Sequence, residues 1–287
     1  MSRSLRHGSV LPEASLLRAT SPPMKWYFAI SESSLGLESH DWPRLIKVAV
    51  ASAQAHTSLQ PRLLYDGQPN DLTRWMERRG VQIIHHRVPF LDAFEPLARG
   101  KEHGREWLAM VAGTFLRIEI PQVEREQELV LYTDCDIMFQ PGFRLDDLAT
   151  PKFFAASGRK RLVRRPAINA GVMLINVPAM RREYTELVQF IRGNVRIGLD
   201  QEMLIAYFGR RIDLLPDVLN WYPYRGIEPQ ARLVHFHGPK PTPLQIVFDH
   251  PEAIAGFPDE WKDLLRKNPA AYRHYVGLWR KYAEGLV

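Results

Sequence analysis

The chain has 287 residues, of which 45% are hydrophobic and 24% are charged, a balance that excludes disorder over the whole length. The length suits one α/β domain with elaborations, and the net charge of +6 favours anionic partners such as phosphates, nucleotides or anionic lipid surfaces. The single cysteine, Cys135, excludes an intrachain disulfide and a cysteine-rich zinc site, and it favours a reducing, cytoplasmic compartment.

The two ends of the chain differ from its middle. Residues 1–23 lack the continuous apolar core of a signal peptide. They contain Ser, Arg and Pro without a clear period, so we predict a disordered tail there. No apolar run approaches the roughly 18 residues that a membrane helix needs. The folded part is predicted to divide into a main domain, 24–250, and a helical C-terminal extension, 251–287.

Strands and helices alternate in the first third of the folded part. Asp41 and Asp71 are expected to cap the two helices, and this β-α-β-α-β order predicts a mostly parallel sheet flanked by helices on both faces. The predicted strands are 24–30, 61–67 and 81–90, and the predicted helices are 42–55 and 72–80.

The rest of the chain continues this pattern. Pro121 is expected to end a helix that starts at Trp107. Further strands are predicted at 129–139, 153–157, 168–177 and 233–237, and further helices at 181–192, 198–208 and within 258–287. The last segment carries five aromatic residues among basic ones, which predicts a core-facing helix or, alternatively, contact with an anionic membrane surface: Trp261, Tyr272, Tyr275, Trp279 and Tyr282.

Two carboxylates follow the buried strand that begins at Leu129. Asp134 and Asp136 are two residues apart, so on an extended chain their side chains point the same way and repel each other unless a cation or a proton lies between them. Ligands of open α/β sheets bind at the carboxyl ends of strands. The pair therefore predicts a Mg²⁺ or Mn²⁺ site, with a solvated strand-end turn as the alternative.

Three further clusters are candidates for a polar site. In LVHFHGPKP, His235 or His237 could add an imidazole ligand, Gly238 permits close backbone approach and Lys240 could meet a phosphate. Asp200 and Gln201 stand at the head of a helix, where Asp200 serves as an N-cap, a ligand contact or both. Asn169 precedes two small residues in a strand, which indicates either close packing by a sugar or backbone, or only a bulge or tight strand crossing.

Taken in order, VLYTDCDIMF, PAINAGVMLIN, GLDQEML and LVHFHGPKP resemble the motifs of glycosyltransferase family 8. FLRIEIPQV and LLPDVLNWYPYRG resemble two more motifs of this family, and the likeness covers roughly residues 24–245. The resemblance implies a GT-A fold, a Rossmann-like, mostly parallel sheet that binds a nucleotide sugar. It also implies metal-dependent transfer of a hexose, with retention, from a donor such as a UDP-sugar to a glycan or lipid-linked acceptor.

The resemblance also implies roles for individual residues. Asp134 and Asp136 would hold Mn²⁺ or Mg²⁺ and contact the nucleotide, with His235 as the third protein ligand. The remaining implied contacts are Lys240 and Gly238 with the diphosphate, Asn169, Asp200 and Gln201 with the donor sugar, and Arg117 with donor hydroxyls or the D-x-D loop.

The chain departs from the family at two places. Ser31 begins a Ser-Glu-Ser-Ser run where the family's first strand often ends in residues that contact base and ribose. The histidine motif is one residue shorter and lacks the family's Trp, so His237 could replace or assist His235. The basic segment 159–165 is either a solvated loop or a flap over an anionic substrate.

Two other functions compete with the glycosyltransferase. A haloacid dehalogenase-type phosphatase also places D-x-D after a strand, but Met138 stands where that pattern wants Thr or Val. A nucleotide-sugar-binding protein without turnover is compatible with the departure at Ser31. Nucleic-acid binding is not expected, because the basic residues are dispersed.

Overall fold

The computed structural model describes residues 22–36, 40–145, 148–159 and 167–286. Nearly all of the predicted tail 1–23 lies outside the described residues, and so does most of the basic segment 159–165. In the described part, seven strands form one sheet in the order β3-β2-β1-β4-β7-β6-β8, and two more form a small separate sheet. Strands β1 to β4 are mutually parallel, and β7 runs antiparallel to both β4 and β6.

The large sheet is thus mostly parallel, as predicted, and its antiparallel strand β7 is the exception. Its strands are β1 (Lys25–Ile30), β2 (Gln60–Tyr65), β3 (Gln82–His85), β4 (Leu129–Thr133), β6 (Phe154–Arg159), β7 (Ala167–Asn176) and β8 (Asp213–Leu215). The predicted strand 129–139 breaks at the two aspartates, so that its second part, β5 (Ile137–Phe139), leaves this sheet. β5 pairs instead with β9 (Leu233–His235).

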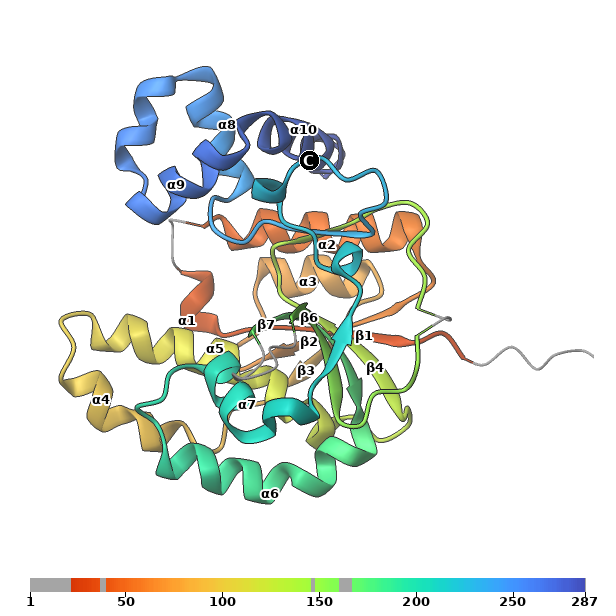
Figure 1. The fold of residues 1–287 in the computed structure, drawn as a ribbon, viewed down its shortest axis with the longest axis vertical. Coiled ribbons are helices and arrows are strands. Elements are labelled where there is room, and N and C mark those ends of the chain that lie inside the picture. The colour runs from red at the N-terminus through yellow and green to blue at the C-terminus, as the bar shows by residue number, and fades with distance from the viewer. Residues whose placement is uncertain (1–21, 37–39, 146–147, 160–166, 287) are drawn as a thin grey trace, which may run out of the picture.

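Helices cover both faces of the large sheet (Figure 1). One face packs against α2 and α3 through residues such as Ile46 and Met76, and the other packs against α5, α6 and α7. The helices are α1 (Glu32–Leu35), α2 (Trp42–His56), α3 (Asp71–Arg78), α4 (Glu95–Arg99), α5 (Gly104–Val123), α6 (Val177–Gly193), α7 (Asp200–Phe208), α8 (Pro241–Asp249), α9 (Asp259–Lys267) and α10 (Pro269–Glu284). Single 3₁₀ turns occur at Leu91–Phe94, Gly209–Arg211, Asp217–Leu219, Pro223–Arg225 and Pro251–Gly256.

Predicted helix ends differ from the structure in several places: α6, for example, begins at Val177 and not at Arg181, whereas α2 begins directly after Asp41, as predicted. Asn70, and not Asp71, caps α3: its side chain accepts the Thr73 backbone N–H, and Thr73 returns the bond in a capping box. Asp41 occupies the cap position of α2, but with φ +50° its side chain makes no capping bond and accepts the Thr242 hydroxyl instead. α5 runs on past Pro121 to Val123, because its last turn tolerates the proline.

The C-terminal helices enclose a third apolar cluster. Tyr272, Tyr275 and Trp279 of α10 are at most 2% exposed and pack with Leu45 and Val48 of α2. The prediction that these aromatic residues face a core is confirmed. No helix in the described part of the chain is long and apolar enough to span a membrane.

Candidate functional site

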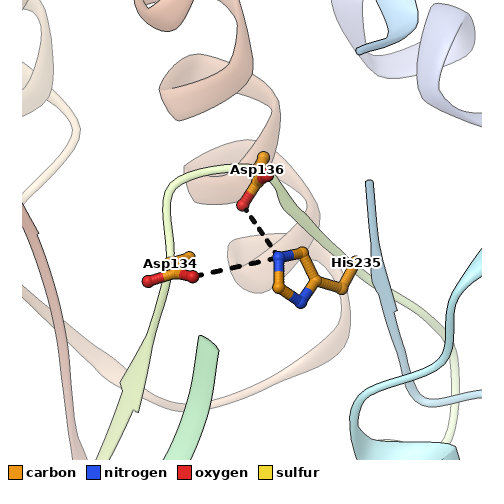
Figure 2. A group of neighbouring side chains, drawn as sticks. All are labelled: Asp134, Asp136 and His235. Atoms are coloured by element: carbon orange, nitrogen blue, oxygen red, sulfur yellow. Dashed lines mark ion pairs between the residues drawn. The ribbon is translucent and has the colours of Figure 1, made fainter. Parts of the chain in front are cut away.

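Two carboxylates and an imidazole converge beyond the carboxyl end of β4 (Figure 2). Asp134 and Asp136 follow β4, and the antiparallel pairing of β5 with β9 places Ile137 opposite His235. His235 Nε2 lies 3.9 Å from Asp134 Oδ2 and 3.3 Å from Asp136 Oδ1. One ligand atom from each residue falls within 4.8 Å of the other two, so the three groups can share one metal ion.

A buried hydrogen-bond network fixes the orientation of the His235 ring. Asn169 Oδ1 accepts the Gly171 backbone N–H and also faces Asn220 Nδ2, so the Asn220 amide must direct its oxygen toward His235 Nδ1, at 2.9 Å. Nδ1 therefore carries the proton in the neutral imidazole and donates it to Asn220. The Nε2 lone pair is left facing the two carboxylates, which is the arrangement of a histidine metal ligand.

Arg117 positions the first carboxylate. Its Nη2 donates to Asp134 Oδ1 at 2.9 Å, and the Tyr132 hydroxyl donates to the same oxygen at 2.9 Å. Asp134 Oδ2 remains directed at His235. Burial alone would lower the pKa of Arg117, but the charges of Asp134 and Asp200 raise it, so the guanidinium stays charged.

Lys240 is the partner of the second carboxylate. Its Nζ donates to Asp136 Oδ2 at 2.6 Å and to the Phe236 carbonyl at 2.9 Å, although its side chain is only 8% exposed. Burial would raise the pKa of Asp136, but the positive charge of Lys240 holds it well below its usual range. The ionised Asp136 therefore keeps one oxygen on Lys240 and turns the other toward His235.

Gly171, one of the two small residues after Asn169, leaves the space in which the triad assembles. A Cβ at this position would lie 2.4 Å from His235 Cε1, 2.7 Å from Asp134 Oδ2 and 2.8 Å from Asn169 Oδ1. The small residues after Asn169 thus serve a close approach by side chains of the site. Asn220 is a functional residue that sequence reasoning missed, although the segment that contains it was recognised.

Asp200 and Gln201 reach the same region from the start of α7. Arg117 Nε lies 3.0 Å from Asp200 Oδ2 but donates its hydrogen to the Thr114 carbonyl, so this buried oxygen accepts no hydrogen bond from the described residues. Burial raises the pKa of Asp200 to about 6, with the Arg117 charge opposing the shift. Gln201 Oε1 accepts the Ala170 backbone N–H, which ties α7 to β7.

A cavity of about 150 Å³ adjoins the triad. Its lining includes both aspartates and, from β1, α1, α2 and α5, the residues Ile30, Ser34, Trp42 and Thr114. Ser31 is fully buried beside it: its hydroxyl accepts the Ser34 N–H as the cap of α1 and donates to the Ala109 carbonyl. Ser34, and not Ser31, lines the cavity.

The segment after β9 is arranged differently from the expected continuous strand. β9 ends at His235, so His237 does not share a strand face with it, and its Nδ1 is buried without a partner in the described part of the chain. Gly238 has φ +90°, which favours glycine, and a Cβ there would lie 2.5 Å from Leu264 Cδ1 of α9. The close approach at Gly238 is therefore to Leu264.

The donor set suits a hard or borderline divalent cation. Two carboxylate oxygens and one neutral imidazole nitrogen match Mn²⁺ and are compatible with Mg²⁺. The three groups direct their lone pairs at one point, and no hydrogen lies between them when His235 is neutral. A divalent cation at that point would stabilise the arrangement. The residues of this chain therefore fit the metal that the motifs imply.

Solved structures with a similar fold are glycosyltransferases. The galactosyltransferase LgtC, solved with donor and acceptor sugar analogues, matches with a TM-score of 0.57 and 17% identity over 84% of this chain and 100% of its own. Glycosyltransferase GlyE of Streptococcus pneumoniae matches with a TM-score of 0.54 and 21% identity over 76% of this chain, which spans 56% of that chain. Mouse xyloside xylosyltransferase 1 matches with a TM-score of 0.52 and 14% identity over 75% of this chain and 98% of its own.

These matches establish the fold. The chain has the GT-A fold of glycosyltransferases, and the resemblance of its motifs to that class is confirmed at this level. No protein-family model matches the chain, and no curated protein matches it in sequence.

Proposed function

We propose that this protein is a metal-dependent, retaining glycosyltransferase that moves a hexose from a nucleotide sugar to a hydroxyl of a glycan or lipid-linked acceptor. A UDP-sugar is the proposed donor, and Mn²⁺ or Mg²⁺ the proposed metal. The observation that carries the proposal is the convergence of Asp134, Asp136 and His235 at the end of β4 within a GT-A fold.

The triad would hold the metal beside the donor diphosphate. When bound, the cation would stabilise the negative charge that grows on the leaving nucleoside diphosphate. Lys240 would add its charge to the same phosphates, and it is already held within 2.6 Å of Asp136. Removal of one such electrostatic contribution typically costs about 10²–10³ in rate.

The cavity beside the triad is the proposed place of the nucleotide. Trp42 lines it, and the buried indole N–H of Trp42 has no acceptor within the described residues, as expected of a group that meets a ligand oxygen. Gly238 remains a proposed donor contact, whereas Ser31 is proposed to act on the donor site through α1, whose Ser34 lines the cavity. The buried Ser31 hydroxyl would act by holding α1 in place.

Asp200 and Gln201 are the proposed catalytic residues. Asp200 Oδ2, which accepts no hydrogen bond from the described residues, would accept one from a hydroxyl of the donor sugar, and Asn169 is a second proposed contact of that sugar. Gln201 is an uncharged amide and a poor nucleophile, so we propose that the acceptor hydroxyl attacks from the face that the diphosphate leaves. A diphosphate oxygen would take the acceptor proton. The oxygen–carbon bond would form as the carbon–phosphate-oxygen bond breaks, with retention of configuration.

A double variant tests the proposal directly. Asp134→Asn with Asp136→Asn should abolish Mn²⁺ binding and hydrolysis of UDP-sugars, because amides neither balance the cation charge nor hold it as firmly. Asp71→Asn, at a fully exposed carboxylate on α3, is the matched control. Unchanged donor hydrolysis in the double variant would contradict the assignment.

Thermal-shift measurements identify the donor and separate the competing functions. UDP-, GDP- and CDP-sugars are compared with and without Mn²⁺, and a stabilisation that requires both metal and UDP-sugar is expected. Binding without any donor hydrolysis or transfer would favour the nucleotide-sugar-binding protein. Hydrolysis of simple phosphomonoesters instead would favour the phosphatase, which the similarity to glycosyltransferase structures disfavours.

A further inference from the structure

A second cavity lies among helices α2, α8 and α10, which gather on one side of the molecule (Figure 1). α10 packs against both α2 and α8. The cavity measures about 430 Å³ and shares no lining residue with the cavity beside the metal triad. It is therefore a separate feature from the proposed donor site.

Three arginines from two helices converge on this cavity. Arg44 comes from α2, and Arg273 and Arg280 come from α10. Arg280 is paired with Glu284 at 2.5 Å, whereas Arg44 and Arg273 have no carboxylate within ion-pair distance among the described residues. Asp249, the other acid of the lining, is exposed at the end of α8. Two unpaired guanidinium groups around one cavity create a site for an anion.

The two unpaired guanidinium groups are held in place by aromatic rings. Arg44 lies 5.2 Å above the ring of the buried Trp279, and Arg273 lies 4.4 Å above the ring of Phe248. Stacking occupies one face of each planar group and leaves its N–H edge free to bind in the plane. Less side-chain freedom is then lost when an anion binds.

Gly277 forms part of the wall of this cavity. It lies inside α10, where glycine destabilises a helix relative to alanine, and its φ is not in the left-handed region. A Cβ built at this position meets no atom within 4 Å. Neither packing nor backbone conformation therefore requires a glycine, and a longer side chain at this position would extend into open space beside the arginines.

We propose that this cavity binds a phosphate group. Phosphate matches the planar N–H edges of arginine better than a single-charged carboxylate does, because it offers more oxygens and more charge. The phosphate could belong to a dissolved molecule or to a lipid headgroup, since both present the same chemistry. This site does not depend on the proposed glycosyltransferase activity.

Binding to the full-length protein tests the proposal with two probes. One is inorganic phosphate, measured by calorimetry, and the other is phosphatidylcholine vesicles with and without phosphatidylglycerol, measured by co-sedimentation. The double variant Arg44→Gln, Arg273→Gln should bind the effective probe at least about tenfold more weakly, as expected for lost charge-assisted hydrogen bonds. The control variant Arg78→Gln, which changes an exposed arginine of α3, should bind the probe like the original protein. UDP-sugar hydrolysis should be unchanged in the double variant and in this control.

The result assigns the source of the phosphate. Binding of inorganic phosphate indicates a dissolved ligand, and binding only to vesicles that contain phosphatidylglycerol indicates a headgroup. If the double variant fails to fold, Gly277→Glu tests the proposal instead. It places a carboxylate in the cavity, which should weaken anion binding, while it replaces a helix-destabilising glycine. Gly277→Ala is its control. The proposal is overturned if the original protein binds neither probe, or if the double variant and Gly277→Glu bind as tightly as it does.

Discussion

At the residue scale, the absence of a side chain at Gly171 allows His235 and Asp134 to approach each other in the candidate metal site. Gly171→Ala would force the His235 ring or the Asp134 carboxylate to move, since the added carbon would lie within 2.7 Å of both. We expect Mn²⁺ affinity to fall by about 10–100-fold, the usual effect of displacing groups that orient metal ligands. Isothermal titration with Mn²⁺ measures it.

The control for this substitution is Gly193→Ala at the end of α6, where a Cβ meets no atom within 4 Å. Both variants should fold, because alanine is accepted in β7 and in α6. Equal Mn²⁺ affinity in the two variants would show that the triad does not need the space at Gly171.

Asp200 should make stability depend on pH. Its folded-state pKa of about 6 lies above the ordinary value of 3.8, mainly because the carboxyl is buried. A raised carboxyl pKa contributes stability that is fully present below about pH 4 and is lost as pH rises through about 6. At 1.36 kcal/mol per pKa unit, the contribution amounts to about 3 kcal/mol at most.

Asp200→Asn removes this titration. We expect the free energy of unfolding of the original protein, relative to the variant, to decrease between pH 4.5 and pH 7.5 in EDTA. Denaturant titrations at both pH values measure the difference. A constant difference between the two proteins across this range would show that the pKa of Asp200 is not raised.

At the scale of elements, the capping of α3 predicts different effects on stability for substitutions at the neighbouring residues Asn70 and Asp71. Asn70→Ala should destabilise the protein by about 1 kcal/mol, because it removes the capping box with Thr73. Asp71→Ala should change stability by less than about 0.5 kcal/mol, since its side chain is fully exposed in the first turn. Urea unfolding compares the two, and a larger loss for Asp71→Ala would contradict the structure.

α10 offers a second matched pair of substitutions. The buried Tyr272 hydroxyl has no partner among the described residues, whereas the Tyr275 hydroxyl accepts the Glu228 backbone N–H at 2.8 Å. Tyr272→Phe should leave stability unchanged or raise it by about 1 kcal/mol, and Tyr275→Phe should lower it by a similar amount. The opposite order in thermal unfolding would show that Tyr272 has a hydrogen-bond partner.

Periodicity predicted the helices and the early parallel strands, because burial of one face dictates the spacing of apolar residues. It could not predict that β7 runs antiparallel to β4, since an apolar run reads the same in either direction. Asp134 and Asp136 could be singled out as candidate ligands because they interrupt such a run. Asn220 and Gly171 act through contacts between segments distant in sequence, so no local pattern marked their roles.

At the scale of the whole molecule, the C-terminal helices are joined to the metal site through two elements. α8 begins directly after Lys240, which pairs with Asp136, and α10 packs on α2, whose first residue, Trp42, lines the cavity beside the triad. The apolar cluster under α10 also includes Met138 of β5. Residues 251–287 should therefore unfold together with the large sheet and the helices that cover it.

Trp279→Ala tests this coupling, because Trp279 is 1% exposed in that cluster. Loss of the indole side chain should lower the free energy of unfolding by about 3–5 kcal/mol. The protein should still unfold in a single transition, with its midpoint at a lower temperature. Hydrogen exchange should show α10 and the central strands destabilised together, whereas Leu278→Ala, at a half-buried neighbour, should have a much smaller effect. The contrary result is that Trp279→Ala lowers hydrogen-exchange protection in α10 alone, while Mn²⁺ still stabilises the central strands. The packing of α10 on α2 would then add nothing to the stability of the candidate metal site, and the C-terminal helices would be an independent extension.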